Sequence, residues 1–206
     1  MLRNITAGID VGTHHVKVVI SELVKENGKN ITKILGTGSS ESRGLRHGYI
    51  VNSDDSVQSV EIAVKLAEKS SGIKIHRAYV AVGGIGLSGI TGTAQTVVSR
   101  ADSHVTELDI EKLHALCEES LPANLIQNQK ILHSIPISYK LDGKTIPTKN
   151  PLDMKGTKLE VKMLFITCLE PHLNDLLEVV DRAGVEVIDC LASPIATSFV
   201  TLTKLQ

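Results

Sequence analysis

The segment ITAGIDVGTHHVKVVI, residues 5–20, constrains the fold more than any other part of the chain. Two runs rich in β-branched residues, 5–9 and 16–20, flank the sequence Asp-Val-Gly-Thr-His-His at 10–15. Runs of this kind around a short turn that contains glycine predict a β-hairpin near the amino terminus. An ordinary hairpin turn explains the motif by itself.

The turn of this hairpin also has the residue types of an anion-binding site. Gly12 has no side chain, so the backbone N–H groups around it can approach a phosphate. Asp10 follows the first strand, where its carboxylate can hold a hydrated Mg²⁺ ion, and Lys17 can bring a positive charge to the phosphates. An ion pair between Asp10 and Lys17 across the hairpin is the alternative interpretation of these two charges.

The composition argues against several classes of function. Lys and Arg number 22 against 23 Asp and Glu, so no net charge attracts the molecule to nucleic acid or to an anionic bilayer. Three tyrosines, two phenylalanines and no tryptophan are too few for a base-stacking platform. No stretch has the length and apolar character of a signal peptide or a membrane span, which predicts a soluble chain.

Histidines and cysteines give no sign of a metal or catalytic site. The eight histidines contain no H-x-x-x-H pair, which predicts ordinary surface or core histidines. Three widely spaced cysteines, an odd number, predict reduced thiols in a cytoplasm rather than a disulfide framework. Cys168 and Cys190 fall in strand patterns and are interpreted as small buried apolar residues.

The order of patterns along the chain predicts a mixed α/β sheet with flanking helices. The predicted elements after the hairpin are a strand at 30–38, a helix capped by Ser53 or Asp54 that runs to about residue 70, a strand at 78–82, a helix from Pro171, a strand at 185–191 and a helix from Ser193. Strands that alternate with helices after three antiparallel strands predict parallel pairing with right-handed crossovers.

A small α+β module is predicted to interrupt this sheet. Glycines cluster at 83–86, and beyond them short strands at 87–90 and 93–99, a helix at 106–119 and a strand at 130–139 follow. The segment 158–168 ends in the apolar run Met163 to Ile166, which predicts a return to the buried main sheet. The expected boundaries are therefore 1–84, 85–162 and 163–206.

Several segments are similar, in order and spacing, to the FtsA family of bacterial cell-division proteins. They are AGIDVGTHHVKVVI, SRGLRHGYIVN, ILHSIPISY, NPLDMKG, LEVKMLFITC and LASPIATSFVTL. The resemblance covers essentially the whole chain and implies the actin-like, ribonuclease H-like mixed sheet. It also implies that 1–84 and 163–206 form subdomain 1A, and that 85–162 is the inserted subdomain 1C used for protein contacts.

The resemblance further implies ATP and Mg²⁺ as ligands. Backbone amides of Gly12, Thr13 and His14 would contact the phosphates, Asp10 would face Mg²⁺ through water, and Lys17 would contact a phosphate. No catalytic residue is implied, so we expect a nucleotide-binding structural protein with weak or absent ATP hydrolysis rather than an enzyme. The alternatives are a pilus-assembly actin homologue and an ATP-dependent kinase of the same superfold.

Whole members of the family are expected to polymerise, to tether FtsZ at the cytoplasmic face of the inner membrane, and to recruit other divisome proteins. The resemblance implies that the 206 residues are an amino-terminal portion, because they lack the second phosphate loop, the rest of domain 2 and the carboxy-terminal amphipathic helix. We therefore expect weak nucleotide binding and a monomer or weak self-association from this chain.

Overall fold

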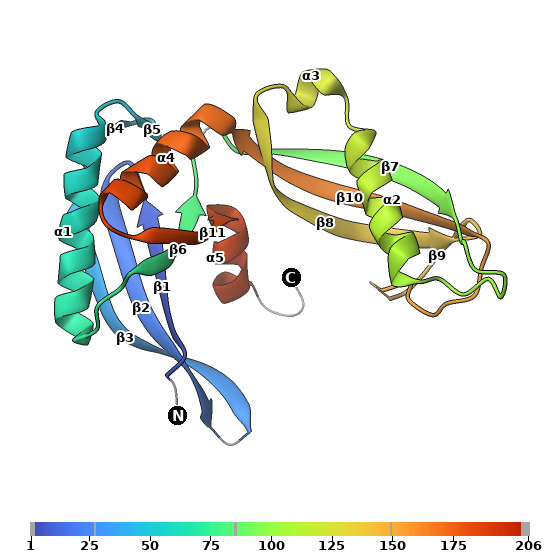
Figure 1. Cartoon of the computed structure of the whole chain (residues 1–206), viewed down its shortest axis with the longest axis horizontal. Helices are drawn as coiled ribbons and strands as arrows, with labels where there is room; N and C mark the ends of the chain where they lie inside the picture. Colours follow the sequence, from blue (N-terminus) through green and yellow to red (C-terminus); the bar gives the residue numbers. More distant parts are fainter. Residues whose placement is uncertain (1–2, 27, 85, 149, 203–206) are drawn as a thin grey trace. The chain divides into compact units, whose positions relative to one another are not determined.

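The computed structural model describes residues 3–26, 28–84, 86–148 and 150–202 (Figure 1). Its internal contacts divide the chain into two compact units, one of Met1–Leu87 with Leu169–Gln206 and one of Ser88–Cys168. Residue 85, where the sequence predicts the start of the inserted module, and residues 203–206, the end of its last predicted segment, lie outside the described ranges.

The first unit is built on a five-stranded sheet with the strand order β11-β6-β1-β2-β3. Its strands are β1 (Ile5–Val11), β2 (His15–Glu26), β3 (Lys29–Glu41), β6 (Arg77–Val82) and β11 (Glu186–Ala192). The pairs β1–β2 and β2–β3 are antiparallel, whereas β6 pairs in parallel with both β1 and β11. The predicted hairpin, third strand and mixed sheet are confirmed.

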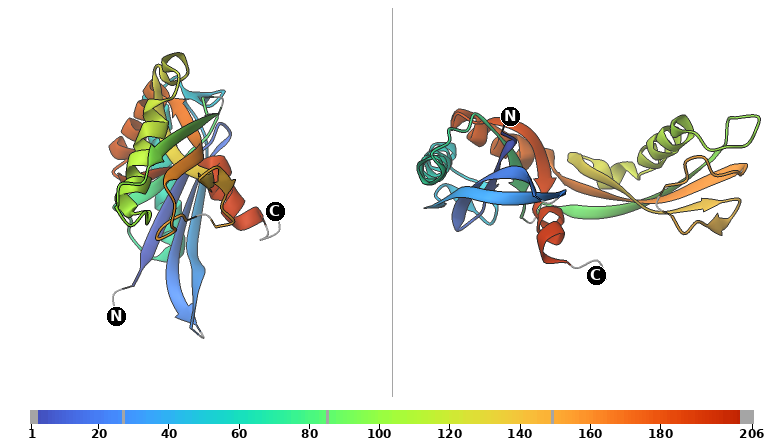
Figure 2. Two further views of the ribbon diagram at one scale, coloured as in Figure 1. Left: turned by 90° about the vertical axis from the view of Figure 1, so that its right-hand side faces the viewer. Right: turned by 90° about the horizontal axis from the view of Figure 1, so that it is seen from below.

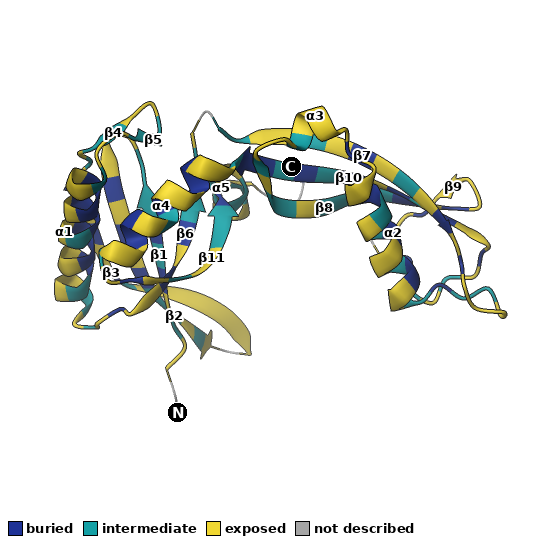
Figure 3. Ribbon diagram, turned by 45° about the horizontal axis from the view of Figure 1, so that its top comes forward, coloured by how far each residue is buried: buried dark blue, intermediate teal, exposed yellow. Residues whose placement is uncertain are grey.

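Alternation along the first two strands decides which face of this sheet is buried. Ala7 and Ile9 on β1 and Val16, Val18 and Ile20 on β2 are at most 3% exposed. Figure 2 shows that α1 (Ser53–Ser71) and α4 (Glu170–Arg182) cover this face, while α5 (Ser193–Thr201) lies on the other. Buried residues accordingly gather on the sides of α1 and α4 that face the sheet (Figure 3).

Both ends of α1 are fixed by specific hydrogen bonds. The cap is Asn52 rather than the predicted Ser53 or Asp54, since its Oδ1 accepts from the N–H groups of Asp54 at 3.1 Å and Asp55 at 3.3 Å. Gly72 ends the helix in the left-handed conformation, at φ 70°.

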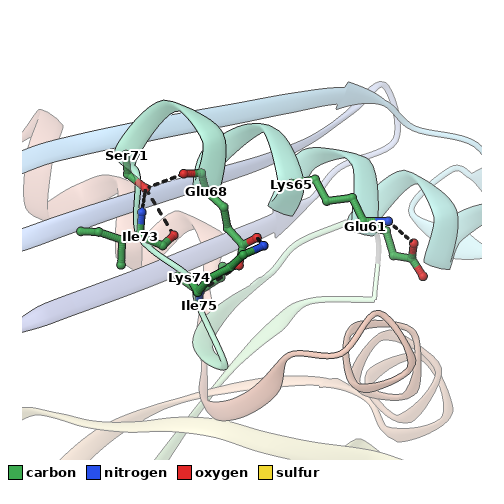
Figure 4. A network of polar contacts seen from close by, with 7 residues as sticks. All are labelled: Glu61, Lys65, Glu68, Ser71, Ile73, Lys74 and Ile75. Atoms are coloured by element: carbon green, nitrogen blue, oxygen red, sulfur yellow. Dashed lines mark hydrogen bonds and ion pairs between the residues drawn. The ribbon is translucent and has the colours of Figure 1, made fainter.

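The chain leaves α1 through a polar network drawn in Figure 4. The carboxylate of Glu68 accepts from the backbone N–H of Ile75 at 2.9 Å and binds the ammonium of Lys74 at 2.5 Å. The side chain of Glu68 thereby fixes the connection from α1 to β6, the strand between β11 and β1.

The second unit is an antiparallel sheet covered by a helix. Its elements are β7 (Ser88–Val97), α2 (Glu107–Glu119), α3 (Ala123–Ile126), β8 (Gln129–Leu141), β9 (Lys144–Thr145) and β10 (Lys158–Leu169), with the strand order β7-β10-β8-β9. Leu113 and Cys117 of α2 are buried with Leu159 and Phe165 of β10 in one apolar core. The predicted inserted α+β module is confirmed in its architecture.

Two sequence-based predictions about this unit are wrong. Residues 163–168 do not return to the main sheet, because Met163 to Thr167 of β10 pair with β7. The apolar run suggested a strand buried on both faces, yet Met163 and Phe165 are buried while Leu164 and Ile166, which alternate with them, stay partly exposed. The structural unit therefore extends to Cys168 rather than to residue 162.

The second wrong prediction concerns the two short strands expected at 87–90 and 93–99. They form the single strand β7, because Gly92 does not break it. A β carbon at Gly92 would lie 3.1 Å from side-chain atoms of Cys117, Leu121 and Phe165. The glycine therefore marks a close approach between strand and core rather than a turn.

Candidate functional site

The candidate site is a cleft of about 240 Å³ in the first unit, at the carboxyl ends of its three parallel strands. Asp10 to Thr13 line it at the end of β1, Gly83 and Gly84 line it just after β6, and Ser193 lines it just after β11. Open α/β sheets bind their ligands at this edge, because the connecting loops and helix starts converge there. The position of the predicted turn within the sheet thus agrees with a binding role.

The turn leaves little room for a side chain at residue 12. A β carbon on Gly12 would lie 3.0 Å from the carbonyl oxygen of His15, and the N–H of Gly12 donates to that oxygen at 3.2 Å. Within the described residues, the N–H groups of Thr13 and His14 have no such acceptor. The free donors of the turn are therefore at Thr13 and His14 rather than at Gly12.

Asp10 is a half-buried carboxylate that accepts no hydrogen bond from the described part of the chain. Burial raises its pKa above the ordinary value, and the positive charge of Lys17 opposes this only in part. The two residues stand directly opposite each other in the β1–β2 register, yet the described residues include no ion pair between them. The charge of Asp10 is thus left without a direct partner.

The structure brings together only part of the predicted site. Asp10, Gly12 and Thr13 line the cleft, but the side chains of His14 and Lys17 do not. Lys17 instead borders, with Asp10, a second hollow of about 310 Å³ on the face of the sheet where α5 packs. Its contact with a phosphate remains a prediction.

Two residues of the cleft were missed by the sequence analysis. His172 is 7% exposed, and neither its Nδ1 nor the buried Oγ of Ser193 has a hydrogen-bond partner in the described structure. They lie at the amino ends of α4 and α5, and neither helix has a side-chain cap. A signal was present in the sequence, because Pro171 and Pro194 mark helix starts that directly follow strands.

A small hairpin of β4 (Leu45–Arg46) and β5 (Tyr49–Ile50) completes the wall of the cleft. The ring of Tyr49 meets that of His172 edge to face, with centroids 5.1 Å apart. A β carbon on Gly48 would lie 3.4 Å from the Cα of Gly84, and both glycines have positive φ. The close backbone approach and the aromatic contact together orient the imidazole of His172.

These features fit the phosphate end of a nucleotide with Mg²⁺. Uncapped helix amino termini, free turn amides and two unpaired polar side chains all favour an anion. Mg²⁺ in nucleotide sites commonly takes one or two protein carboxylates and completes its shell with water and phosphate oxygens. Asp10 suits that pattern, and no group of three metal-ligating side chains occurs among the described residues. At about 240 Å³, the cleft is below the roughly 300–1,000 Å³ of whole-ligand sites.

Comparison with known proteins decides the family. A family model described as "SHS2 domain inserted in FTSA" matches residues 88–167, nearly the whole second unit. The chain is 33% identical over 205 residues to "Cell division protein FtsA" of Borreliella burgdorferi, with 99% of this chain and 48% of that protein covered. The chain belongs to the FtsA family. This confirms the resemblance inferred from the sequence.

Other FtsA proteins align over a similar extent. The FtsA of Pseudomonas aeruginosa is 30% identical, with 96% of this chain and 45% of that protein covered, and the FtsA of Bacillus subtilis is 31% identical, with 95% and 43% covered. The chain therefore spans about half the length of the FtsA proteins it matches.

A solved structure supports the actin-like fold class. The "PilM-PilN type IV pilus biogenesis complex" superposes with a TM-score of 0.57 at 14% identity, covering 94% of this chain and 49% of that chain. At this identity the likeness concerns the fold alone. In the described part of this FtsA-family chain, no helix combines the length and apolarity needed to cross a bilayer.

Proposed function

We propose that the cleft of this FtsA-family chain binds the phosphates of Mg-ATP. The observation that carries the proposal is the convergence of a glycine turn with the amino termini of α4 and α5 at the carboxyl ends of β1, β6 and β11. Neither terminus has a side-chain cap, and each carries a buried polar atom without a partner in the described structure. Leaving such atoms unpaired costs free energy, which a bound anion would recover.

Each predicted residue has a stated role in this proposal. The N–H groups of Thr13 and His14 donate to phosphate oxygens, and Gly12 keeps the turn narrow enough for the approach. Asp10 holds Mg²⁺ through water, and Lys17 adds a positive charge near the phosphates. The metal ion supplies charge neutralisation of the phosphates.

The role proposed for the whole protein is that of a cell-division scaffold. It would bind ATP, assemble into filaments, tether FtsZ at the cytoplasmic face of the inner membrane, and recruit divisome proteins through the inserted unit. Family membership supports this proposal. We propose a structural role rather than enzymatic catalysis, in line with the family assignment.

The pilus-assembly alternative is less well supported. Its evidence is a likeness of fold at 14% identity, whereas the FtsA proteins align at 30–33% over nearly the whole chain. The proposed subdomain names, 1A for the first unit and 1C for the second, follow the same family assignment.

Titration of the ¹⁵N-labelled 206-residue chain with Mg-ATP tests the proposed site. We expect the amide signals of Thr13, His14 and Gly84 to shift in a saturable way, with weak affinity. The matched control is Asp10→Asn, which retains the shape of residue 10 and should lose the Mg²⁺ dependence of the shifts. Saturable shifts confined to residues outside the cleft would contradict the proposal.

Filament formation is tested separately by light scattering. We expect no nucleotide-dependent increase in scattering from the 206-residue chain, because a head-to-tail filament needs two complementary faces on each subunit. Filaments from this chain alone would contradict the expectation of a monomer or weak self-association.

A further inference from the structure

His172 is the one histidine among the described residues that lines the cleft. It is 7% exposed, and its buried Nδ1 has no hydrogen-bond partner in the described part of the chain. A buried polar nitrogen of this kind costs free energy unless a group outside the chain completes it. The feature therefore indicates a missing binding partner.

The side chains around the imidazole of His172 explain how the ring is oriented, but they do not explain why a polar nitrogen is present at this position. Tyr49 contacts the imidazole edge to face at 5.1 Å between centroids, and Leu176 lines the cleft one helical turn further along α4. A phenylalanine at residue 172 would keep the aromatic contact with Tyr49. The histidine thus adds a polar atom to a position that packing alone would not require.

Ser193 offers a second donor to the same space. Its buried Oγ also has no hydrogen-bond partner among the residues that the structure describes, and a β carbon on Gly83 would lie 3.0 Å from it. Because Gly83 has no β carbon, the space beside the hydroxyl of Ser193 is not filled by a side chain of residue 83. A neutral imidazole with its proton on Nδ1 and a serine hydroxyl both donate hydrogen bonds.

We propose that His172, through Nδ1, and Ser193, through Oγ, bind the terminal phosphate of the nucleotide and so distinguish a triphosphate from a diphosphate. This inference rests on the proposed phosphate-binding function of the cleft. ATP carries one phosphate more than ADP, so its third phosphate can reach the amino ends of α4 and α5 while the inner phosphates contact the β1–β2 turn. ADP, which ends one phosphate earlier, would leave the two side chains unpaired.

The test compares the affinities of Mg-ATP and Mg-ADP, measured by NMR titration of the 206-residue chain. His172→Phe retains the aromatic ring but removes both nitrogens. We expect it to weaken Mg-ATP binding about tenfold or more, as the loss of a hydrogen bond to a charged group does, and to change Mg-ADP binding less than about twofold. Ser193→Ala should show the same selectivity with a smaller loss.

A conservative variant separates binding from packing. His172→Asn places a side-chain amide nitrogen near the position of Nδ1 and should retain most of the preference for ATP. His104→Phe is the matched control, because His104 also has a buried Nδ1 without a hydrogen bond but lies in the other unit, 3.5 Å from Asp102. It should leave both affinities unchanged.

The outcomes distinguish this inference from the function on which it rests. If Mg-ATP shifts the turn amides with the same affinity in wild type and His172→Phe, the inference is wrong and the phosphate site stands. If neither nucleotide shifts the turn amides of the unmodified chain, the proposed function fails and the inference fails with it. Loss of ATP and ADP affinity by the same factor in His172→Phe would show a packing role and overturn the inference.

Discussion

Asp10 is half-buried and Asp109 is buried, but their carboxylates differ in the hydrogen bonds that they accept. Asp109 is 2% exposed and accepts hydrogen bonds from the N–H and Oγ of Ser99, at 3.1 and 2.6 Å, and from the N–H and Oγ1 of Thr106, at 2.9 and 2.7 Å. These bonds outweigh the effect of burial and lower its pKa to about 2. Asp10 accepts none from the described residues, and burial raises its pKa.

The difference separates a structural carboxylate from one available to a ligand. Asp109 completes the capping box of α2 with Thr106, so its charge is fully used inside the second unit. Asp10 ends a strand at a cleft with its charge unused, a typical feature of functional sites. The comparison predicts opposite effects when each carboxylate is neutralised.

The largest expected effect is that of Asp109→Ala. The substitution removes the buried charged acceptor of four hydrogen bonds from Ser99 and Thr106, so the second unit should lose about 3 kcal/mol of unfolding free energy. Urea titration followed through amide signals of β7 and β10 measures the loss. Glu107→Gln, in the same helical turn but exposed, is the matched control and should change stability by less than about 0.5 kcal/mol.

The stability of the second unit should depend on pH through the carboxylate of Asp109. A pKa lowered from 3.8 to about 2 means that the folded state holds the charged form more tightly than the unfolded state. Its contribution, about 2 kcal/mol, is complete above pH 4 and is lost as pH falls through the folded value. In Asp109→Asn, the decline of stability between pH 4 and pH 2 should be shallower. An unchanged slope would contradict the assignment.

Asp10→Asn should change stability in the opposite direction to the Asp109 substitutions. Since the pKa of Asp10 is raised, folding disfavours its charged form, so the penalty is absent at low pH and appears as pH rises from the unfolded value through the folded one. At pH 7 without nucleotide, the substitution should therefore stabilise the first unit, by about 0.5 kcal/mol. Thermal unfolding with and without Mg-ATP tests this, and a destabilised variant would show that the chain itself uses the carboxylate.

The smallest expected effect on stability is that of Gly83→Ala. The new β carbon would lie 3.0 Å from the Oγ of Ser193, so the hydroxyl must shift by a few tenths of an ångström. Stability should change by less than about 0.5 kcal/mol, while Mg-ATP affinity should fall severalfold. Unchanged affinity would remove Ser193 from the ligand-binding atoms.

Local patterns in the sequence predicted much of the fold. The β-branched runs around Gly12, the alternation of strands and helices, and the proline and glycine signals located the main elements within a few residues. Residues 163–168 were misplaced because an apolar run does not specify which sheet it joins. That choice depends on the pairing of β10 with β7, which joins segments distant in sequence.

The same local patterns predicted part of the candidate site. Asp10, Gly12 and Thr13 form one local motif, and the structure places all three at the cleft. His172 and Ser193 belong to other elements, and their importance lies in a missing hydrogen bond that only the folded chain reveals. A sequence pattern shows which donors and acceptors the residues carry, whereas only the folded structure shows which of them lack a hydrogen-bond partner.

Paramagnetic broadening tests the central claim most directly. Mn²⁺ can replace Mg²⁺ with ATP on the ¹⁵N-labelled chain, and its effect on amide signals falls steeply with distance. The account predicts that the strongest broadening falls on Val11 to Thr13 and on Gly84, and that Asp10→Asn abolishes it. Broadening centred on Ser88–Cys168, or unchanged broadening in Asp10→Asn, would contradict the assignment of this cleft as the nucleotide site.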